Sequence, residues 1–111
     1  MTKVQSRIMY IELKGDSLTG PARIGRVTFS QTGRTLYYRG KQFRKTRRGY
    51  KWNCYDVESK EYYWISGCKR NGQDRLYGES MSIIIDEDVR EEYWTTIRRQ
   101  PDKIAKKIAN R

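Results

Sequence analysis

The sequence predicts an α+β fold that is mainly β: a small, bent antiparallel sheet or partly open barrel of SH3-like or OB-like kind, with one C-terminal amphipathic helix. Three observations lead to this prediction. Short runs rich in β-branched and aromatic residues alternate with turn residues up to residue 85. The hydrophobic period then changes from two residues to about 3.6. The length of 111 residues suits one domain with one hydrophobic core.

The N-terminal part of the chain predicts a strand followed by a hairpin. Residues 7–13, RIMYIEL, are the first β-prone run. The hairpin consists of a strand over 24–29 and a strand over 35–39, and Gly33 supplies the positive φ that the turn between them needs. We expect the segment KQFRKTRRGY (41–50) to extend the second of these strands into a loop that ends at Gly49.

A second hairpin is predicted over residues 50–66, YKWNCYDVESKEYYWIS. A two-residue turn at Ser59 and Lys60 would set Tyr55 opposite Trp64. Because alternate side chains of a strand point to opposite faces, the hairpin has one apolar face, which we take as the core face. The predicted core face consists of Trp52, Cys54 and Ile65. The other face is mixed and consists of Lys51, Asn53, Tyr55, Tyr62 and Trp64.

The C-terminal part predicts a strand and the helix. MSIII (81–85) is typical of a short, fully buried strand. The helix is expected over about 88–99, with Asp88 as N-cap and Glu91 three residues later. Its apolar face consists of Val89, Tyr93, Trp94 and Ile97. We expect residues 1–100 to form the domain and residues 101–111 to form a short basic tail, helical or flexible.

Several classes of chemistry find no support in the residue types. The chain has no His, which removes the usual general base, and its only two Cys are Cys54 and Cys68. Two Cys without His cannot supply the four ligands of a structural zinc site. A reactive thiol at Cys68, next to Lys69 and Arg70, is the alternative that the pattern leaves open. We therefore expect no catalytic residues, no metal, no cofactor and no small-molecule substrate.

The hydrophobic pattern also bears on location. No apolar run is longer than about four residues, whereas a membrane-spanning helix needs about twenty. The first residues, MTKVQSRIMYIEL, contain no apolar segment of the signal-peptide kind. We therefore expect a cytoplasmic protein with reduced thiols and without a membrane anchor.

The uneven charge is the main functional signal. The net charge is +11, and residues 17–55 hold ten basic residues and no acidic one. This favours a non-catalytic module that binds nucleic acid, with single-stranded DNA or RNA preferred. The expected contact residues are Arg39, Lys41, Arg44, Lys45, Arg47, Arg48, Lys51, Tyr55, Tyr62 and Trp64. The alternative is a protein-interaction module (an inhibitor, immunity-type or adaptor protein) that recognises an acidic partner, because Arg, Tyr and Trp are also hot-spot residues of protein interfaces.

Three blocks, GPARIGRVTFSQTGRTLYYRG, YDVESKEYYWISGCKRNGQDRLY and IDEDVREEYW, cover about half of the chain. In these blocks the chain resembles a group of small uncharacterised bacterial proteins, some of which carry the name deoxyxylulose-phosphate synthase. That name implies a thiamine-diphosphate enzyme several times longer, with catalytic histidines that this chain lacks, so we take it to be a misannotation. The resemblance implies a bacterial, cytoplasmic origin and no catalytic residues. Members of the group often have Pro at the position of Cys68.

Overall fold

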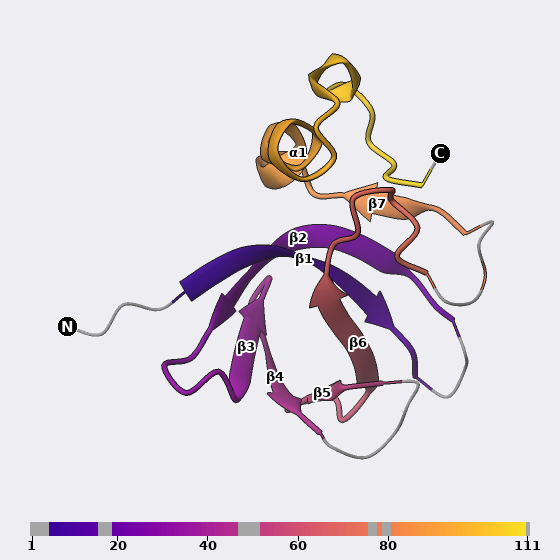
Figure 1. Ribbon diagram of the computed structural model, residues 1–111. Helices are drawn as coiled ribbons and strands as arrows, with labels where there is room; N and C mark the ends of the chain where they lie inside the picture. The colour runs from indigo at the N-terminus through magenta and orange to yellow at the C-terminus, as the bar shows by residue number, and fades with distance from the viewer. Residues whose placement is uncertain (1–4, 16–18, 47–51, 76–77, 79–80, 111) are drawn as a thin grey trace.

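The computed structural model describes residues 5–15, 19–46, 52–75, 78 and 81–110. Six antiparallel strands form a closed barrel, and a seventh strand and a short C-terminal helix lie on one side of it (Figure 1). The predicted fold class, a small antiparallel barrel with one C-terminal helix, is confirmed. No helix among the described residues combines the length and the apolar composition that crossing a bilayer requires.

The barrel follows the chain from strand to strand. Its strands are β1 (Gln5–Leu13), β2 (Ala22–Phe29), β3 (Thr35–Tyr38), β4 (Lys41–Lys45), β5 (Cys54–Asp56) and β6 (Tyr62–Gly67). Each pairs antiparallel with the next, and β6 pairs with β1 to close the barrel. The seventh strand, β7 (Ile83–Ile85), runs parallel to β2. Closure leaves no open edge in the barrel itself, which protects the strands from pairing with other chains.

The chain makes one turn more than the sequence predicted. The strand over 35–39 does not continue; it ends at Tyr38 and reverses at Arg39 and Gly40, whose φ angles of 49° and 79° are typical of a type I′ turn. Tyr38 pairs with Lys41 across this turn, and β4 returns along β3. The prediction failed here because Arg is an uncommon residue at positive φ. The expected loop end at Gly49 lies outside the described residues.

The second hairpin has a longer turn and another register than predicted. Tyr55 pairs with Tyr62, not with Trp64. The turn spans residues 57–61, because the Asp56 carboxylate accepts hydrogen bonds from the backbone N–H groups of Glu58 (2.9 Å) and Ser59 (3.4 Å). The shift in register amounts to two residues, and a shift of two keeps every side chain on its face.

The predicted core face of this hairpin is correct in two of its three members. Cys54 and Ile65 are buried, whereas Trp52 is only half-buried and precedes β5. Its indole stacks on the ring of Tyr62, on the outside of the barrel, with 4.3 Å between the ring centroids. The period-two pattern does not extend back to Trp52 because the strand begins after it.

The apolar residues form two cores. The first fills the barrel and consists of Met9, Ile11, Val27, Leu36, Tyr38, Phe43, Cys54, Tyr63 and Ile65. The second lies between the outer surface of β1, β2 and β7 and the helix, and it consists of Ile8, Tyr10, Ala22, Ile24, Ile83, Ile85, Val89, Tyr93, Trp94 and Ala109. β1 contributes to both cores because its successive side chains alternate between the inside and the outside of the barrel. This explains why its residues 8 to 12 are all buried.

The helical segment runs from Glu87 to Ile97. It consists of a 3-10 turn η1 (Glu87–Val89), the α-helical turn α1 (Arg90–Glu92) and a π-helical turn η2 (Tyr93–Ile97). The predicted apolar face is confirmed, but the N-cap residue is Asp86, not Asp88. Asp86 does not cap the helix with its side chain, because Arg23 and Tyr38 bind its carboxylate.

The C-terminal segment folds back onto β7. It forms one 3-10 turn, η3 (Pro101–Lys103), and then lies along the free edge of β7. The backbone N–H of Ile85 donates to Lys107 O, and that of Ala109 donates to Ile83 O, both at 2.8 Å. β7 therefore has partners on both edges. The prediction that this strand is fully buried is wrong, because Ile84 is 43% exposed between two buried isoleucines.

Candidate functional site

The predicted cations do not share one surface. Arg39 and Lys41 lie at the end of the barrel that carries the β3–β4 and β5–β6 turns, and each faces a carboxylate. The guanidinium of Arg39 lies 3.7 Å from Asp86 Oδ1, and Lys41 Nζ lies 3.4 Å from Asp56 Oδ2. Burial opposes ionisation of Asp56, but the hydrogen bonds from Glu58 and Ser59 outweigh it, so the pKa of this carboxyl is lowered. Both cations are thus engaged within the protein.

Arg44 instead begins a row of side chains that crosses three strands on the outside of the barrel. It pairs with Tyr55 of β5, and Tyr55 pairs with Tyr62 of β6. Trp52 stacks on Tyr62 with an angle of 23° between the ring planes. We call these four residues, Arg44, Tyr55, Tyr62 and Trp52, the aromatic row.

The aromatic row is open to solvent and lies beside two cations. Tyr62 is 39% exposed, Arg44 is exposed, and Tyr55 and Trp52 are half-buried. Lys60, which adopts a φ of 67°, holds its ammonium 6.0 Å from the centre of the Tyr55 ring. Among the described residues no ion pair involves Arg44 or Lys60. The row therefore offers aromatic ring faces beside cations that have no carboxylate partner in that part of the chain.

Trp64 does not join the aromatic row, although it points to the same face of β6. In the pairing of β6 with β1, Trp64 lies opposite Glu12. The Trp64 side chain packs against the second core. Its Nε1 donates to Ser66 Oγ at 3.1 Å. Trp64 is therefore a half-buried packing residue on the helix side of the barrel, apart from the aromatic row, and its role as a contact residue stays a prediction.

Three of the predicted contact residues, Arg47, Arg48 and Lys51, lie outside the described residues. Thr46 and Asn53, which flank this stretch, are joined by a hydrogen bond of 2.9 Å from Thr46 N to Asn53 O. From the predicted set, the aromatic row therefore contains Arg44, Tyr55 and Tyr62, and Lys45 lies apart from it.

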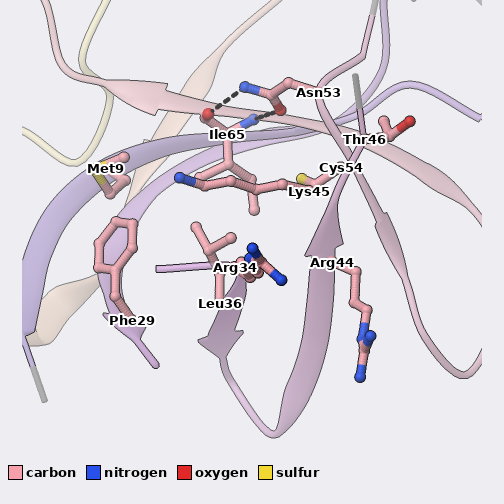
Figure 2. Close-up of a pocket in the computed structure, with 10 residues that line it drawn as sticks. All are labelled: Met9, Phe29, Arg34, Leu36, Arg44, Lys45, Thr46, Asn53, Cys54 and Ile65. Atoms are coloured by element: carbon pink, nitrogen blue, oxygen red, sulfur yellow. Dashed lines mark hydrogen bonds between the residues drawn. The ribbon is translucent and has the colours of Figure 1, made fainter. Parts of the chain in front are cut away.

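Lys45 and Arg34 belong to a second feature, the open end of the barrel between the β2–β3 turn and the residues Thr46 and Asn53. A cavity of about 680 Å³ opens there (Figure 2). Its lining consists of Met9, Phe29, Arg34, Leu36, Arg44, Lys45, Thr46, Asn53, Cys54 and Ile65. We call this cavity the mouth. Sequence reasoning missed Arg34 as a contributor, although a basic residue directly after the turn glycine Gly33 was a visible signal.

Two buried clusters of polar side chains have structural roles. In one, Glu12 faces Lys14 and Arg75 in the wall of the second core. In the other, Asp86 binds Arg23 Nε at 2.6 Å and accepts a 2.5 Å hydrogen bond from the Tyr38 hydroxyl, which ties the barrel to the start of the helix. Burial and the bond to Asp86 raise the pKa of Tyr38 far above its ordinary value, so this phenol stays protonated.

Neither thiol has the environment of a nucleophile. Burial raises the pKa of Cys54 to about 12, and burial with the nearby Asp74 raises that of Cys68 to about 12 as well. The basic neighbours of Cys68 in the sequence do not offset its burial. No group of three or more Cys, Asp or Glu side chains in the described part of the chain is arranged to hold a metal ion.

Comparison of the chain with protein-family models, with curated proteins and with solved structures found no match.

Proposed function

We propose that this protein binds single-stranded nucleic acid, DNA or RNA, through the aromatic row. The observation that carries the proposal is the direct cross-strand sequence Arg44–Tyr55–Tyr62, extended by the stacked indole of Trp52. Such a row combines a cation for phosphates with ring faces for bases, and base–aromatic stacking contributes about 1–3 kcal/mol per base.

The geometry favours a single strand over a duplex. Stacking on Tyr62 and Trp52 requires bases whose faces are free, and duplex bases stack on one another instead. The helical segment that begins at Glu87 carries the carboxylates of Glu87 and Asp88 in its first turn. These charges repel phosphates, so the helix is unsuited to enter a major groove.

The cations at the row also determine how strongly the binding of nucleic acid should depend on salt. If Arg44 and Lys60 each neutralise one phosphate, log K falls with log salt at a slope of about −1.4 for single strands. Removing one of these cations lowers the magnitude of the slope by about 0.7. Affinity without base preference is expected, because stacking uses ring faces that every base has.

The test is a salt titration of labelled single-stranded DNA, single-stranded RNA and duplex oligonucleotides by fluorescence anisotropy. Tyr62→Ala is expected to weaken single-strand binding about tenfold or more, and Arg44→Gln to reduce the salt slope. Tyr37→Ala is the matched control for the aromatic change, because Tyr37 is 42% exposed on β3, outside the row. Arg39→Gln is the control for the loss of charge. Equal effects of the paired variants, or no binding at low salt, would refute the proposal.

A polyglutamate competitor separates nucleic-acid binding from general attraction to anions. Single-strand binding that resists polyglutamate, with quenching of Trp fluorescence, supports stacking, since Trp52 lies in the row, whereas Trp94 is buried and Trp64 packs against the second core. Complete displacement by polyglutamate without quenching contradicts stacking and favours recognition of an acidic protein through the same surface.

A further inference from the structure

The mouth of the barrel has the features of a ligand site that is distinct from the aromatic row. Its volume of about 680 Å³ lies within the range of about 300–1,000 Å³ that is usual for small-molecule sites, which often occupy the mouths of β-barrels. The residues at the floor of the cavity are apolar, and the residues at its rim include cations. Only Arg44 belongs to both the mouth and the row.

The rim of the mouth carries positive charge that the described part of the chain does not neutralise. Arg34, Arg44 and Lys45 are exposed, and no ion pair among the described residues involves any of them. Lys45 follows Phe43 by two residues, so its side chain points to the inner side of the barrel wall. Its ammonium lies 5.9 Å from the centre of the Phe29 ring, and Figure 2 shows it reaching toward that ring. A bound anion would therefore lie next to an aromatic surface.

The floor of the mouth is apolar and shallow. Leu36, Cys54 and Ile65 are each at most 5% exposed. Phe43 and Val27, which fill the barrel interior, are fully buried. A long alkyl chain has no channel to enter, whereas a flat ring fits across such a floor.

The polar group on this floor is already occupied. The Asn53 side chain donates to Ile65 O at 2.7 Å and accepts from Ile65 N at 2.9 Å, as the dashed lines in Figure 2 show. Burial also keeps the Cys54 thiol neutral. Recognition at the floor is therefore by contact with a ring and not by hydrogen bonds to its edge.

We propose that the mouth binds a nucleoside monophosphate, with the phosphate between Arg34 and Lys45 and the base against Phe29 and the apolar floor. The same chemistry is presented by a free mononucleotide and by the terminal nucleotide of a strand. The proposal does not depend on the aromatic row, because Arg34, Lys45 and Phe29 lie outside it.

The test uses the methyl group of Met9, which lines the mouth. The chain has three methionines, and the ¹³C-methyl NMR signals of Met9 and Met81 can be assigned with Met→Leu variants. Titration with AMP is expected to move the Met9 signal in a saturable way. The Met81 signal is the internal control, because this residue is 37% exposed and lies beside Thr19, away from the mouth. A Met9 signal that stays in place at millimolar AMP would overturn the proposal.

Further ligands and variants test each part of the proposed ligand. Arg34→Gln and Lys45→Gln are each expected to weaken AMP binding about tenfold, because hydrogen bonds between charged groups are lost. Arg26→Gln, which removes an exposed ion pair with Glu92, is the matched control. Inorganic phosphate that moves the Met9 signal as strongly as AMP would overturn the role of the ring. An equal response to dodecanoate would overturn the nucleotide class.

Binding of a nucleotide at the mouth and binding of a strand at the aromatic row can be tested separately. Arg34→Gln is expected to weaken AMP binding about tenfold and to leave stacking of a circular single strand on the aromatic row unchanged, whereas Tyr62→Ala is expected to weaken stacking and to leave AMP binding unchanged. If AMP moves the Met9 signal, a comparison of two strands shows which form of the nucleotide the mouth binds. Binding of a linear strand with a terminal phosphate that is tighter than binding of the same strand in circular form identifies the strand end as the ligand. Equal binding of the two strands identifies the free nucleotide as the ligand.

Discussion

Replacing Glu12 by Gln tests whether a buried ion cluster holds the outer wall of the barrel. Glu12 is 1% exposed and accepts hydrogen bonds from the Tyr10 hydroxyl (2.5 Å) and from Gly20 N (3.1 Å). Its Oε2 also lies 3.1 Å from Lys14 Nζ and 3.6 Å from the Arg75 guanidinium. The two cations are as deeply buried as the carboxylate, with side chains 2% exposed. The substitution keeps the shape of the side chain and removes the only carboxylate of this cluster.

The expected cost follows from this burial. Removing one partner of a buried ion pair destabilises a protein by about 3–5 kcal/mol, because the remaining charge stays away from water. Gln still accepts a hydrogen bond from Tyr10, so we expect about 3 kcal/mol. A chain of this length has a free energy of unfolding of about 5–15 kcal/mol. The variant should thus lose a large part of its stability, with a fall in Tm of about 12–20 °C.

Urea denaturation followed by circular dichroism measures this loss. The matched control is Glu92→Gln, since Glu92 is 51% exposed and forms a surface pair with Arg26 at 2.7 Å, which should contribute at most about 1 kcal/mol. The double variant Glu12→Gln/Lys14→Met removes one of the two buried cations that face Glu12 and should recover part of the stability. The reasoning is refuted if Glu12→Gln costs no more than Glu92→Gln, or if the double variant is less stable than the single one.

Three further predictions concern the packing and the titration of buried groups. Gly25→Ala should destabilise the fold by about 1–3 kcal/mol in the same urea assay, because the added Cβ would lie 2.4 Å from Asp86 Oδ2; an unchanged midpoint would contradict this. Burial raises the pKa of Tyr93 to about 12, above its value of about 10 in the unfolded chain. The stability that comes from this raised pKa is present below pH 10 and is lost as the pH rises toward 12. Tyr93 should therefore ionise only when the protein unfolds. The difference in tyrosinate absorbance between the wild type and Tyr93→Phe should appear together with the loss of the circular dichroism signal, not before it. Because burial also raises the pKa of Cys54 and Cys68 to about 12, a thiol reagent near neutral pH should label the folded protein far more slowly than the urea-unfolded chain, and equal rates would contradict the burial argument.

The two hairpins show which turns and side-chain directions the local sequence pattern predicts. The turn at Gly33 was predicted because a glycine at positive φ is a strong local signal, and its φ is 75°. The turn at Arg39 and Gly40 was missed because its first residue is an arginine held at positive φ by the pairing of β3 with β4. In the second hairpin the register was wrong by two residues, yet Tyr55 and Tyr62 were placed on the correct face, because side-chain direction repeats every two residues.

The candidate site was predictable only in part for a similar reason. Residues close in the sequence, such as Lys41 and Arg44, lie at different places on the barrel, and one faces a carboxylate while the other does not. Conversely, Arg34 and Lys45 are eleven positions apart and line the same mouth. Charge clustering along the chain therefore indicated a basic protein but not which cations share a surface.

By itself, the amino-acid sequence determined the mainly β class, the single amphipathic helix, the positive charge and most of the buried faces. These properties depend on composition and on periods of two and 3.6 residues, which are local. Only the tertiary structure decided that β6 closes on β1, that Trp64 packs under the helix side while Tyr62 stays exposed, and that an apolar mouth opens beside Arg34. The physical reason is that strand order and register are set by contacts between distant residues, and these contacts decide which neighbouring side chains meet.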